Sequence, residues 1–155
     1  MKTIQVTFTM NGASVFMAKF KFEGMDEYIT TLGRIGGKQA RSILKYAVYP
    51  GAGLAADAIR ASLDPEHKDT GDLARSLTLA KIIDDHGYVN TKIMFADYDS
   101  KGVPNAIKAA ALESGTSRGQ KGTHFISHTI KSVKSSVIEA MSNALDDKIG
   151  QIMGD

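Results

Sequence analysis

The sequence has no cysteine and no tryptophan, and it has only three prolines. Without cysteine the protein cannot form disulfides, use a catalytic thiol or bind a metal through thiolates. No apolar run approaches the roughly 20 residues of a membrane-spanning helix. Residues 1–8 alternate in polarity, unlike the apolar block of a signal peptide. These absences predict a globular protein with no disulfide framework and no membrane partner.

The bulk composition predicts a single domain, residues 1–155. Hydrophobic residues make up 43% and charged residues 23% of the chain, values typical of globular proteins. The formal charge of +2 is too small to indicate a nucleic-acid-binding protein, but the charges are unevenly distributed. Basic residues outnumber acidic ones over 108–134, and acidic ones dominate over 57–72. This asymmetry suits head-to-tail self-association or a charged partner.

Alternating apolar and polar residues predict two β-hairpins. Residues 3–9 and 14–22 alternate on either side of Asn11-Gly12, a dipeptide that favours a tight hairpin turn. Residues 76–83 and 88–96 alternate around a turn predicted over 84–87. The apolar positions expected to share a face are Leu77, Leu79 and Ile83 in the earlier strand, and Val89, Ile93 and Phe95 in the later one.

Helical spacing predicts the first helices. A short helix is expected over 25–35 and a helical region over 38–63, closed by Asp64-Pro65. Pro50 interrupts the second region because proline removes a backbone donor and clashes with the preceding turn. The pattern fits either two helices or one kinked helix. After a loop over 66–71, a single helical turn is expected over 72–74, capped by Asp69 or Thr70.

The strongest helical pattern lies at the C-terminal end. From Ile126 to Ile152 apolar residues recur every three or four positions, which predicts one long amphipathic helix. A shorter helix is expected over 106–113, after a loop over 97–104. Together the elements predict an α+β fold, in which an antiparallel sheet built from hairpins packs against helices.

The residues between these last two helices are the most informative stretch. Three glycines punctuate it, Gly115, Gly119 and Gly122, and two cations lie among them, Arg118 and Lys121. Gly115 is placed to end the first helix, and Phe125 to anchor the next. We interpret the stretch as a hinge and contact loop with a mobile tip. The expected assembly residues are Glu113, Gly115, Thr116, Arg118, Lys121 and Phe125.

The same region supports an alternative function. Arg118, Lys121, Lys131 and Lys134 could contact DNA phosphates. No aromatic residues are interleaved with these cations for base stacking, and no recognition-helix motif accompanies them. The alternative is therefore a small DNA- or anion-binding module that uses the basic 118–134 surface.

Motifs of catalysis are weak throughout the sequence. His124 and His128 have the spacing that lets two imidazoles share a metal, but no third ligand and no HExxH glutamate accompany them. The glycine-rich segments lack the GxxxxGK[ST] spacing of a P-loop, and no serine lies in a GxSxG setting. We therefore predict no enzyme activity, no cofactor and no metal.

Four short segments carry a resemblance to a known family. They occur in the family's order and are Gly24-Met-Asp-Glu-Tyr-Ile-Thr-Thr-Leu32, Asp69-Thr-Gly-Asp-Leu-Ala-Arg-Ser-Leu77, Ala110-Ala-Leu-Glu-Ser-Gly-Thr116 and Thr123-His-Phe-Ile-Ser-His-Thr-Ile130. The set resembles the tail-completion or neck proteins of siphophages, also called minor tail components. The resemblance spans about 24–130, although Ser114 stands where the family has an aromatic residue.

The resemblance implies a structural virion protein of a tailed phage or prophage. Such a subunit is not an enzyme; it completes the tail and joins it to the head as a ring. The implied partners are further copies of the chain, with a hexamer favoured, tail-tube and head-completion proteins, and passing DNA bound without sequence preference. The implied location is the virion neck, after assembly in the host cytoplasm.

Overall fold

The computed structural model of the protein describes residues 3–11, 15–23, 33, 36–63, 71–85 and 88–154. Its elements in chain order are β1 (Thr3–Asn11), β2 (Val15–Glu23), α2 (Gly37–Leu63), α3 (Asp72–Ser76), β3 (Leu77–Leu79), β4 (Ile83–Asp85), β5 (Tyr88–Phe95), α4 (Asn105–Ser114) and α5 (Phe125–Met153). This order confirms the predicted α+β fold with a long C-terminal helix. The helix expected over 25–35 and the loop expected over 66–71 fall almost entirely outside the described residues.

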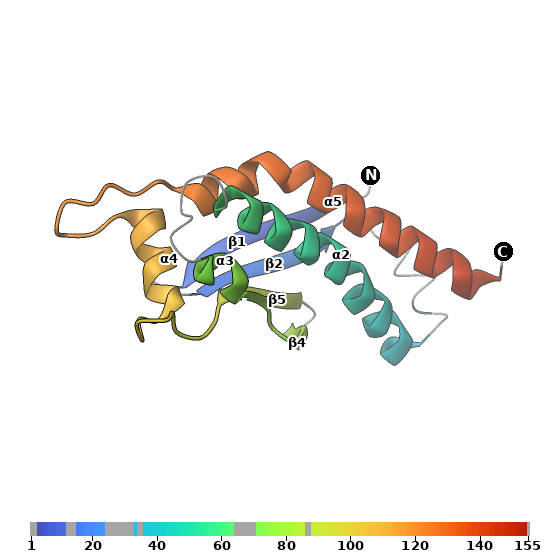
Figure 1. Ribbon diagram of the computed structural model, residues 1–155. Coiled ribbons are helices and arrows are strands. Elements are labelled where there is room, and N and C mark those ends of the chain that lie inside the picture. The colour runs from blue at the N-terminus through green and yellow to red at the C-terminus, as the bar shows by residue number, and fades with distance from the viewer. Residues whose placement is uncertain are drawn as a thin grey trace.

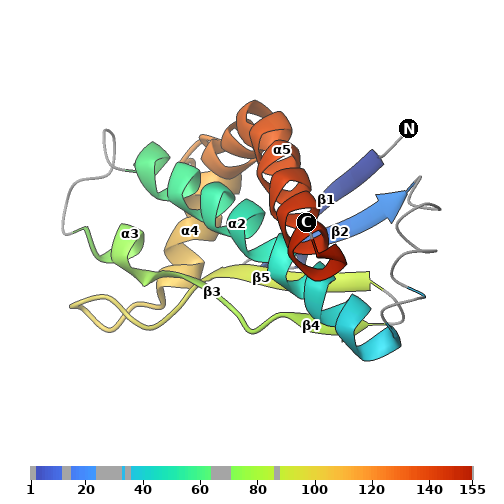
Figure 2. The ribbon, with the colours of Figure 1, turned by 90° about the vertical axis from the view of Figure 1, so that its right-hand side faces the viewer.

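One antiparallel sheet contains all five strands. Its order is β1-β2-β5-β3, and β4 pairs with β5 beyond the end of β3. The first predicted hairpin is confirmed, because β1 and β2 pair continuously from Thr3↔Glu23 to Asn11↔Val15. Helices α2 and α5 lie side by side and cover one face of the sheet (Figures 1 and 2).

The strand predicted over 76–83 is two short strands, because a bulge separates them. The last pair of β3 is Leu79↔Ile93, whereas the first pair of β4 is Ile83↔Asn90. Three residues of this segment therefore face two residues of β5, and one extra residue reverses the alternation. Ile82 is accordingly buried, while Ile83 is 48% exposed. The prediction that Ile83 continues the apolar face was wrong for this reason.

The strand that follows agrees with its prediction. Asp84 and Asp85, which were expected in a turn over 84–87, belong to β4, where Asp85 pairs with Tyr88; residues 86 and 87 lie outside the described residues. The face of β5 that meets the helices is almost inaccessible to solvent, and its members are Val89, Thr91, Ile93 and Phe95. The shared face predicted for three of these residues is confirmed.

Helix α2 is one helix from Gly37 to Leu63, with Pro50 inside it. An interior proline removes one helical hydrogen bond and costs about 3 kcal/mol. Packing outweighs this local cost, because the neighbours of Pro50 on the inner side of the helix, Val48, Gly51 and Ala52, are buried in the core. Gly51 lies against α5 so closely that an added Cβ would be 2.8 Å from Sδ of Met141. The structure therefore selects one helix over two.

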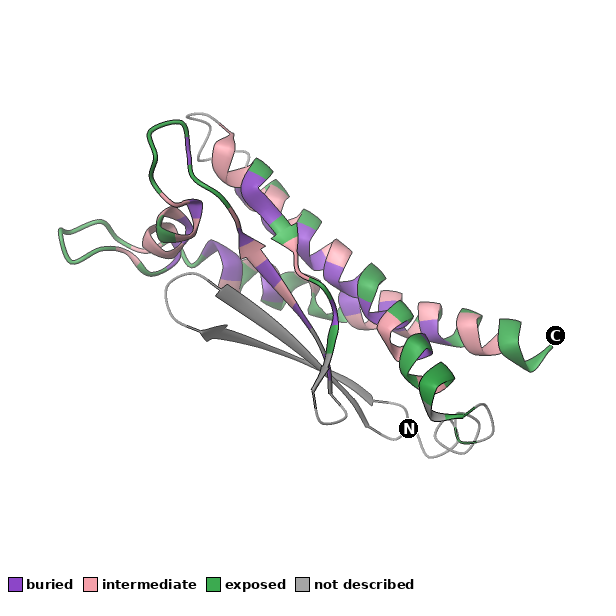
Figure 3. Cartoon of the chain, turned by 90° about the horizontal axis from the view of Figure 1, so that it is seen from below, coloured by how far each residue is buried: buried purple, intermediate pink, exposed green. Residues whose placement is uncertain are grey.

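Helix α5 follows the predicted stripe. Its buried residues face α2 and the sheet (Figure 3), and they are Phe125, Ile126, Ile130, Val137, Met141 and Leu145. The stripe ends before the helix does, because Ile152 is 37% exposed. A smaller cluster of Ile43, Ala47 and Leu145 joins the first half of α2 to the last half of α5. The two helices are therefore antiparallel.

Helix α3 confirms the predicted single turn. It begins after Gly71, which has a φ of 67° and takes the capping position expected for Asp69 or Thr70. Arg60 holds α3 and the start of β3 against α2. Its Nε donates to Ala74 O at 3.3 Å and its Nη2 donates to Leu77 O at 3.2 Å.

Candidate functional site

The stretch between α4 and α5 projects from the body of the protein as a narrow loop (Figure 1). Helix α4 begins one residue earlier and ends one residue later than predicted. Gly115 follows it with a φ of 81°, and its N–H donates to Ala111 O at 2.8 Å. The prediction that Gly115 ends this helix is confirmed, since a positive φ is accessible to glycine at little cost.

Glu113 is a buried cap for α5. Its side chain is enclosed, with 1% of the residue exposed. Oε2 accepts a hydrogen bond from Ile126 N at 2.8 Å, and Oε1 accepts from Ser127 N at 3.2 Å and from the Ser127 hydroxyl. The residue at the usual capping position, His124, makes no side-chain cap bond and has a φ of 51°. Glu113 therefore accepts hydrogen bonds from free N–H groups at the start of a helix that begins 12 residues later in the chain. Its carboxyl group also lies at the positive end of the dipole of that helix.

Two glycines allow the two legs of the loop, residues 113–115 and 120–122, to cross in direct backbone contact. Gly115 and Lys121 form an isolated β-bridge. An added Cβ on Gly115 would lie 2.5 Å from Gln120 O, and one on Gly122 would lie 2.5 Å from Glu113 O. Neither position has room for a side chain, so the base of the loop closes only with glycine at both positions.

The tip of the loop is closed by its own hydrogen bonds. Thr116 N donates to Gln120 O at 2.9 Å, and Gly119 N donates to Thr116 O at 3.2 Å. Gly119 turns the chain with a φ of 98°. Every residue from Thr116 to Lys121 is exposed. This geometry favours a pre-formed contact surface over the mobile tip that we expected.

Apart from the half-buried Gly115, which ends α4, the residues singled out from the sequence divide into two groups. Glu113 and Phe125 are buried and join α4 to α5; the Phe125 ring meets Phe95 edge-on at 6.4 Å between centroids. They act from inside the fold as positioning residues, and the burial of Phe125 fits the anchoring role expected for it. The exposed group consists of Thr116, Arg118 and Lys121 on the loop, and Lys131 and Lys134 on α5.

A second ordered loop lies beside α4, and the sequence analysis missed what holds it. Oδ1 of the buried Asp99 accepts hydrogen bonds from Lys101 N at 2.9 Å and Val103 N at 2.7 Å, and Oδ2 pairs with Lys108 of α4. The Lys108 hydrogen bond, and then that of Val103, lower the pKa of Asp99 from 3.8 to about 2, against the opposing effect of burial.

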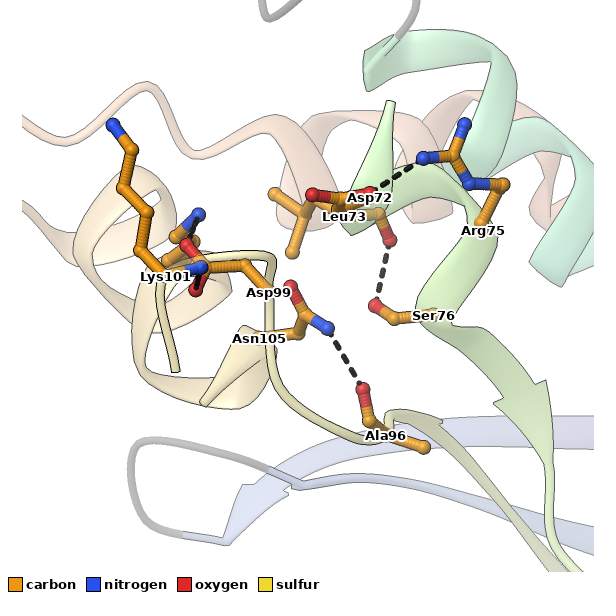
Figure 4. Close-up of polar contacts among 9 residues, drawn as sticks. Asp72, Leu73, Arg75, Ser76, Ala96, Asp99, Lys101 and Asn105 are labelled. Atoms are coloured by element: carbon orange, nitrogen blue, oxygen red, sulfur yellow. Dashed lines mark hydrogen bonds and ion pairs between the residues drawn. The ribbon is translucent and has the colours of Figure 1, made fainter. Parts of the chain in front are cut away.

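Asn105 fixes the start of α4 against β5. Its Nδ2 donates to Ala96 O at 3.0 Å (Figure 4), and its backbone N–H donates to Asp97 O at 3.0 Å. The turn-forming residues of Asp97-Tyr-Asp-Ser-Lys-Gly102 are the sequence signal for this loop. The pairing of Asp99 with Lys108 has no such signal, because it depends on where α4 packs.

The two histidines remain a weak candidate. The His124 and His128 rings are exposed, with centroids 6.3 Å apart and planes tilted by 46°. Across the ranges that the structure describes, no three potential metal-ligating side chains gather at one place. In the same ranges no helix is both long and apolar enough to cross a membrane.

The arrangement as a whole can present a fixed, basic, solvent-exposed loop to a partner. Comparison of the chain with models of protein families, with curated proteins and with solved structures found no match.

Proposed function

We propose that the chain is a structural virion protein of a tailed phage or prophage, a neck or tail-completion subunit that forms a ring joining the tail to the head. A hexameric ring is favoured, located in the virion neck after assembly in the host cytoplasm. Its partners are further copies of the chain and the tail-tube and head-completion proteins. The proposal begins from the resemblance of the four sequence segments, which span about 24–130.

The observation that carries the proposal is the pre-formed loop between α4 and α5. Its base is held by the crossing of Gly115 and Gly122, and Glu113 anchors its exit to α5. The exposed tip therefore projects without the large entropic cost of ordering on contact, a property suited to docking on a neighbouring subunit. A subunit that docks on its neighbours can use such a fixed projection. The proposed function requires no catalytic residues.

The test is genetic complementation of a phage or prophage whose own copy of the gene for this chain has been deleted. The gene is deleted, the wild-type chain or an Arg118→Glu/Lys121→Glu variant is supplied from a plasmid, and particles are examined by electron microscopy. We expect the deletion to leave heads and tails unjoined, the wild type to restore virions, and the variant to fail. Normal virions after deletion of the gene would overturn the proposal.

A second candidate is binding of DNA or another polyanion. One observation favours it: the exposed residues from Ser114 to Ser136 include no carboxylate. Hydroxyl, amide, glycine, histidine and cationic residues make up this exposed set, and several of these types bind phosphate backbones without reading bases. Under the first proposal the same surface would meet passing DNA weakly.

Salt-titrated binding to a random DNA duplex separates the two candidates. If Arg118, Lys121, Lys131 and Lys134 all contact phosphates, log K should fall with log salt at a slope of about −3.6. Removing the two loop cations should reduce the slope by about 1.8. Tight binding by the isolated monomer with this slope would make the DNA-binding candidate the primary one; negligible binding would eliminate it.

A further inference from the structure

Two histidines lie in the chain between the cations of the projecting loop and the lysines of α5. The His124 and His128 rings are exposed, and their centroids lie 6.3 Å apart. The backbone of His124 is fixed, because its N–H donates to Glu113 O at 3.1 Å and its carbonyl accepts from His128 N at 2.9 Å. Both imidazoles are therefore presented to solvent from ordered backbone positions.

The histidines belong to a row of polar side chains along one side of α5. Positions 124, 128, 131 and 135 are separated by four, three and four residues, a spacing that places them on one face of a helix. We call these exposed residues the α5 row; they are His124, His128, Lys131 and Ser135. The row is about 16 Å long. The projecting loop, with two further cations, continues beyond the start of α5 and away from the rest of that helix (Figures 1 and 3).

The α5 row ends where the next carboxylate appears. Glu139 lies one helical turn after Ser135, and it is the first acidic residue after Glu113. The Glu113 carboxylate is buried and accepts hydrogen bonds from the start of α5. The row therefore presents cations and neutral donors to solvent without an exposed carboxylate among them.

The same surface has no apolar anchor for a protein partner. Between Ser114 and Ser136 no large hydrophobic side chain is exposed. Contacts between proteins ordinarily centre on buried aromatic or aliphatic side chains, so this composition favours a hydrated polyanion over an acidic protein. No phenylalanine, tyrosine or tryptophan is exposed there to stack on unpaired bases, so duplex DNA is favoured over a single strand.

We propose that His124 and His128 donate to phosphates of duplex DNA, as neutral groups between the two pairs of cations. A neutral imidazole carries one N–H donor, and such a donor can bond a phosphate oxygen. The histidines are the only long polar side chains in residues 122–130. This inference rests on the DNA-binding candidate and adds two residues to its surface.

Salt-titrated binding separates neutral donors from cations. A protein cation that meets a phosphate releases a counterion, so its loss makes the slope of log K against log salt shallower by about 0.9. Loss of a neutral donor lowers K at every salt concentration and leaves the slope unchanged. The probe is a random DNA duplex at pH 8.5, well above the range in which imidazole ordinarily takes up a proton. Fluorescence anisotropy measures K.

The test variant is His124→Gly/His128→Ala. Glycine suits the φ of 51° at residue 124, and alanine suits an exposed helical position, so the fold should be kept. We expect K to fall about tenfold for the loss of two hydrogen bonds, with the slope unchanged. Lys131→Ala/Lys134→Ala should instead make the slope shallower by about 1.8.

Single variants check the double variant. Asn143→Ala removes an exposed neutral side chain from α5 beyond the row and should leave K unchanged. His128→Gln keeps a neutral donor at its position, so it should retain more affinity than His128→Ala. Equal losses from these two substitutions would show that the donor is not responsible and would overturn the inference.

The outcomes distinguish this inference from the function on which it rests. Wild-type binding with a slope of about −3.6 that the histidine variant leaves unaltered in both K and slope would overturn the inference, and the DNA-binding candidate would stand. A shallower slope of the histidine variant would show cationic contacts and overturn the neutral role. Tighter binding of a single strand than of the duplex would overturn the assigned ligand. Negligible binding by the wild type would overturn both the inference and the candidate.

Discussion

The Glu113 carboxylate accepts a hydrogen bond of 2.8 Å from the backbone N–H of Ile126. Together with the bonds of the same carboxylate to Ser127, this contact joins the end of α4 to the first turn of α5 across the projecting loop. Because the loop is held between these two helices, the stability of α5 and the position of the loop depend on the same buried side chain.

Removal of this cap should destabilise the protein. Glu113→Ala leaves the N–H groups of Ile126 and Ser127 without their acceptor, and we expect a loss of about 2 kcal/mol in the free energy of unfolding. Urea denaturation measures the loss. Glu139→Ala, at an exposed position of the same helix, is the control and should change stability by less than about 0.5 kcal/mol. Equal effects of the two variants would refute the cap.

The backbone crossing predicts a strict requirement at Gly122. Gly122→Ala would place its Cβ 2.5 Å from Glu113 O, so the legs of the loop must separate. We expect a loss of about 1–3 kcal/mol, similar to overpacking of a core. Thermal unfolding measures it. Gly150→Ala is the matched control, since an added Cβ there meets nothing within 4 Å and lies in a helix. Both variants behaving alike would show that the loop has no such crossing.

The contact of α2 with α5 predicts opposite effects at two neighbouring glycines. Gly51→Ala should destabilise by about 1–3 kcal/mol, because its Cβ would collide with Met141. Gly53→Ala meets nothing within 4 Å and should stabilise by about 0.5–1 kcal/mol, the difference in helix propensity.

A double-mutant cycle identifies the cause of the Gly51 effect. Met141→Ala makes room beside Gly51, so the cost of Gly51→Ala should be smaller in that background. Additive effects of the two substitutions would mean that the collision with Met141 is not responsible.

The Asp99 carboxylate predicts a pH dependence of stability. Its pKa is lowered to about 2 in the folded protein, so the folded state favours the ionised form. The stabilisation is fully present above the unfolded pKa near 4 and is lost as pH falls toward 2. The wild type should therefore lose its advantage over Asp99→Asn across this interval.

Urea unfolding at pH 5, 3 and 2 measures that advantage directly. Asp97→Asn is the control for removal of a carboxylate from the same loop, where the side chain is exposed. A stability difference between wild type and Asp99→Asn that does not change over this pH range would contradict the role assigned to the carboxylate.

The sequence by itself determined the elements whose patterns are local. The apolar stripe of α5, the shared face of β5, the first hairpin and the end of α4 at Gly115 each follow from side-chain period or backbone freedom within a few residues. The function remains a proposal, because the four resembling segments indicate a family without testing it.

The tertiary structure decided the features that depend on distant residues. Pro50 stays inside α2 because the packing of its buried neighbours, such as Gly51 against Met141, outweighs the local cost of a proline in a helix. The bulge before Ile83 is set by pairing with β5, and the Glu113 cap and the Asp99–Lys108 pair form only where α4 packs. Local propensity is worth a few tenths to a few kcal/mol per residue. Contacts between elements therefore decide the structure wherever their packing contributes more free energy than that.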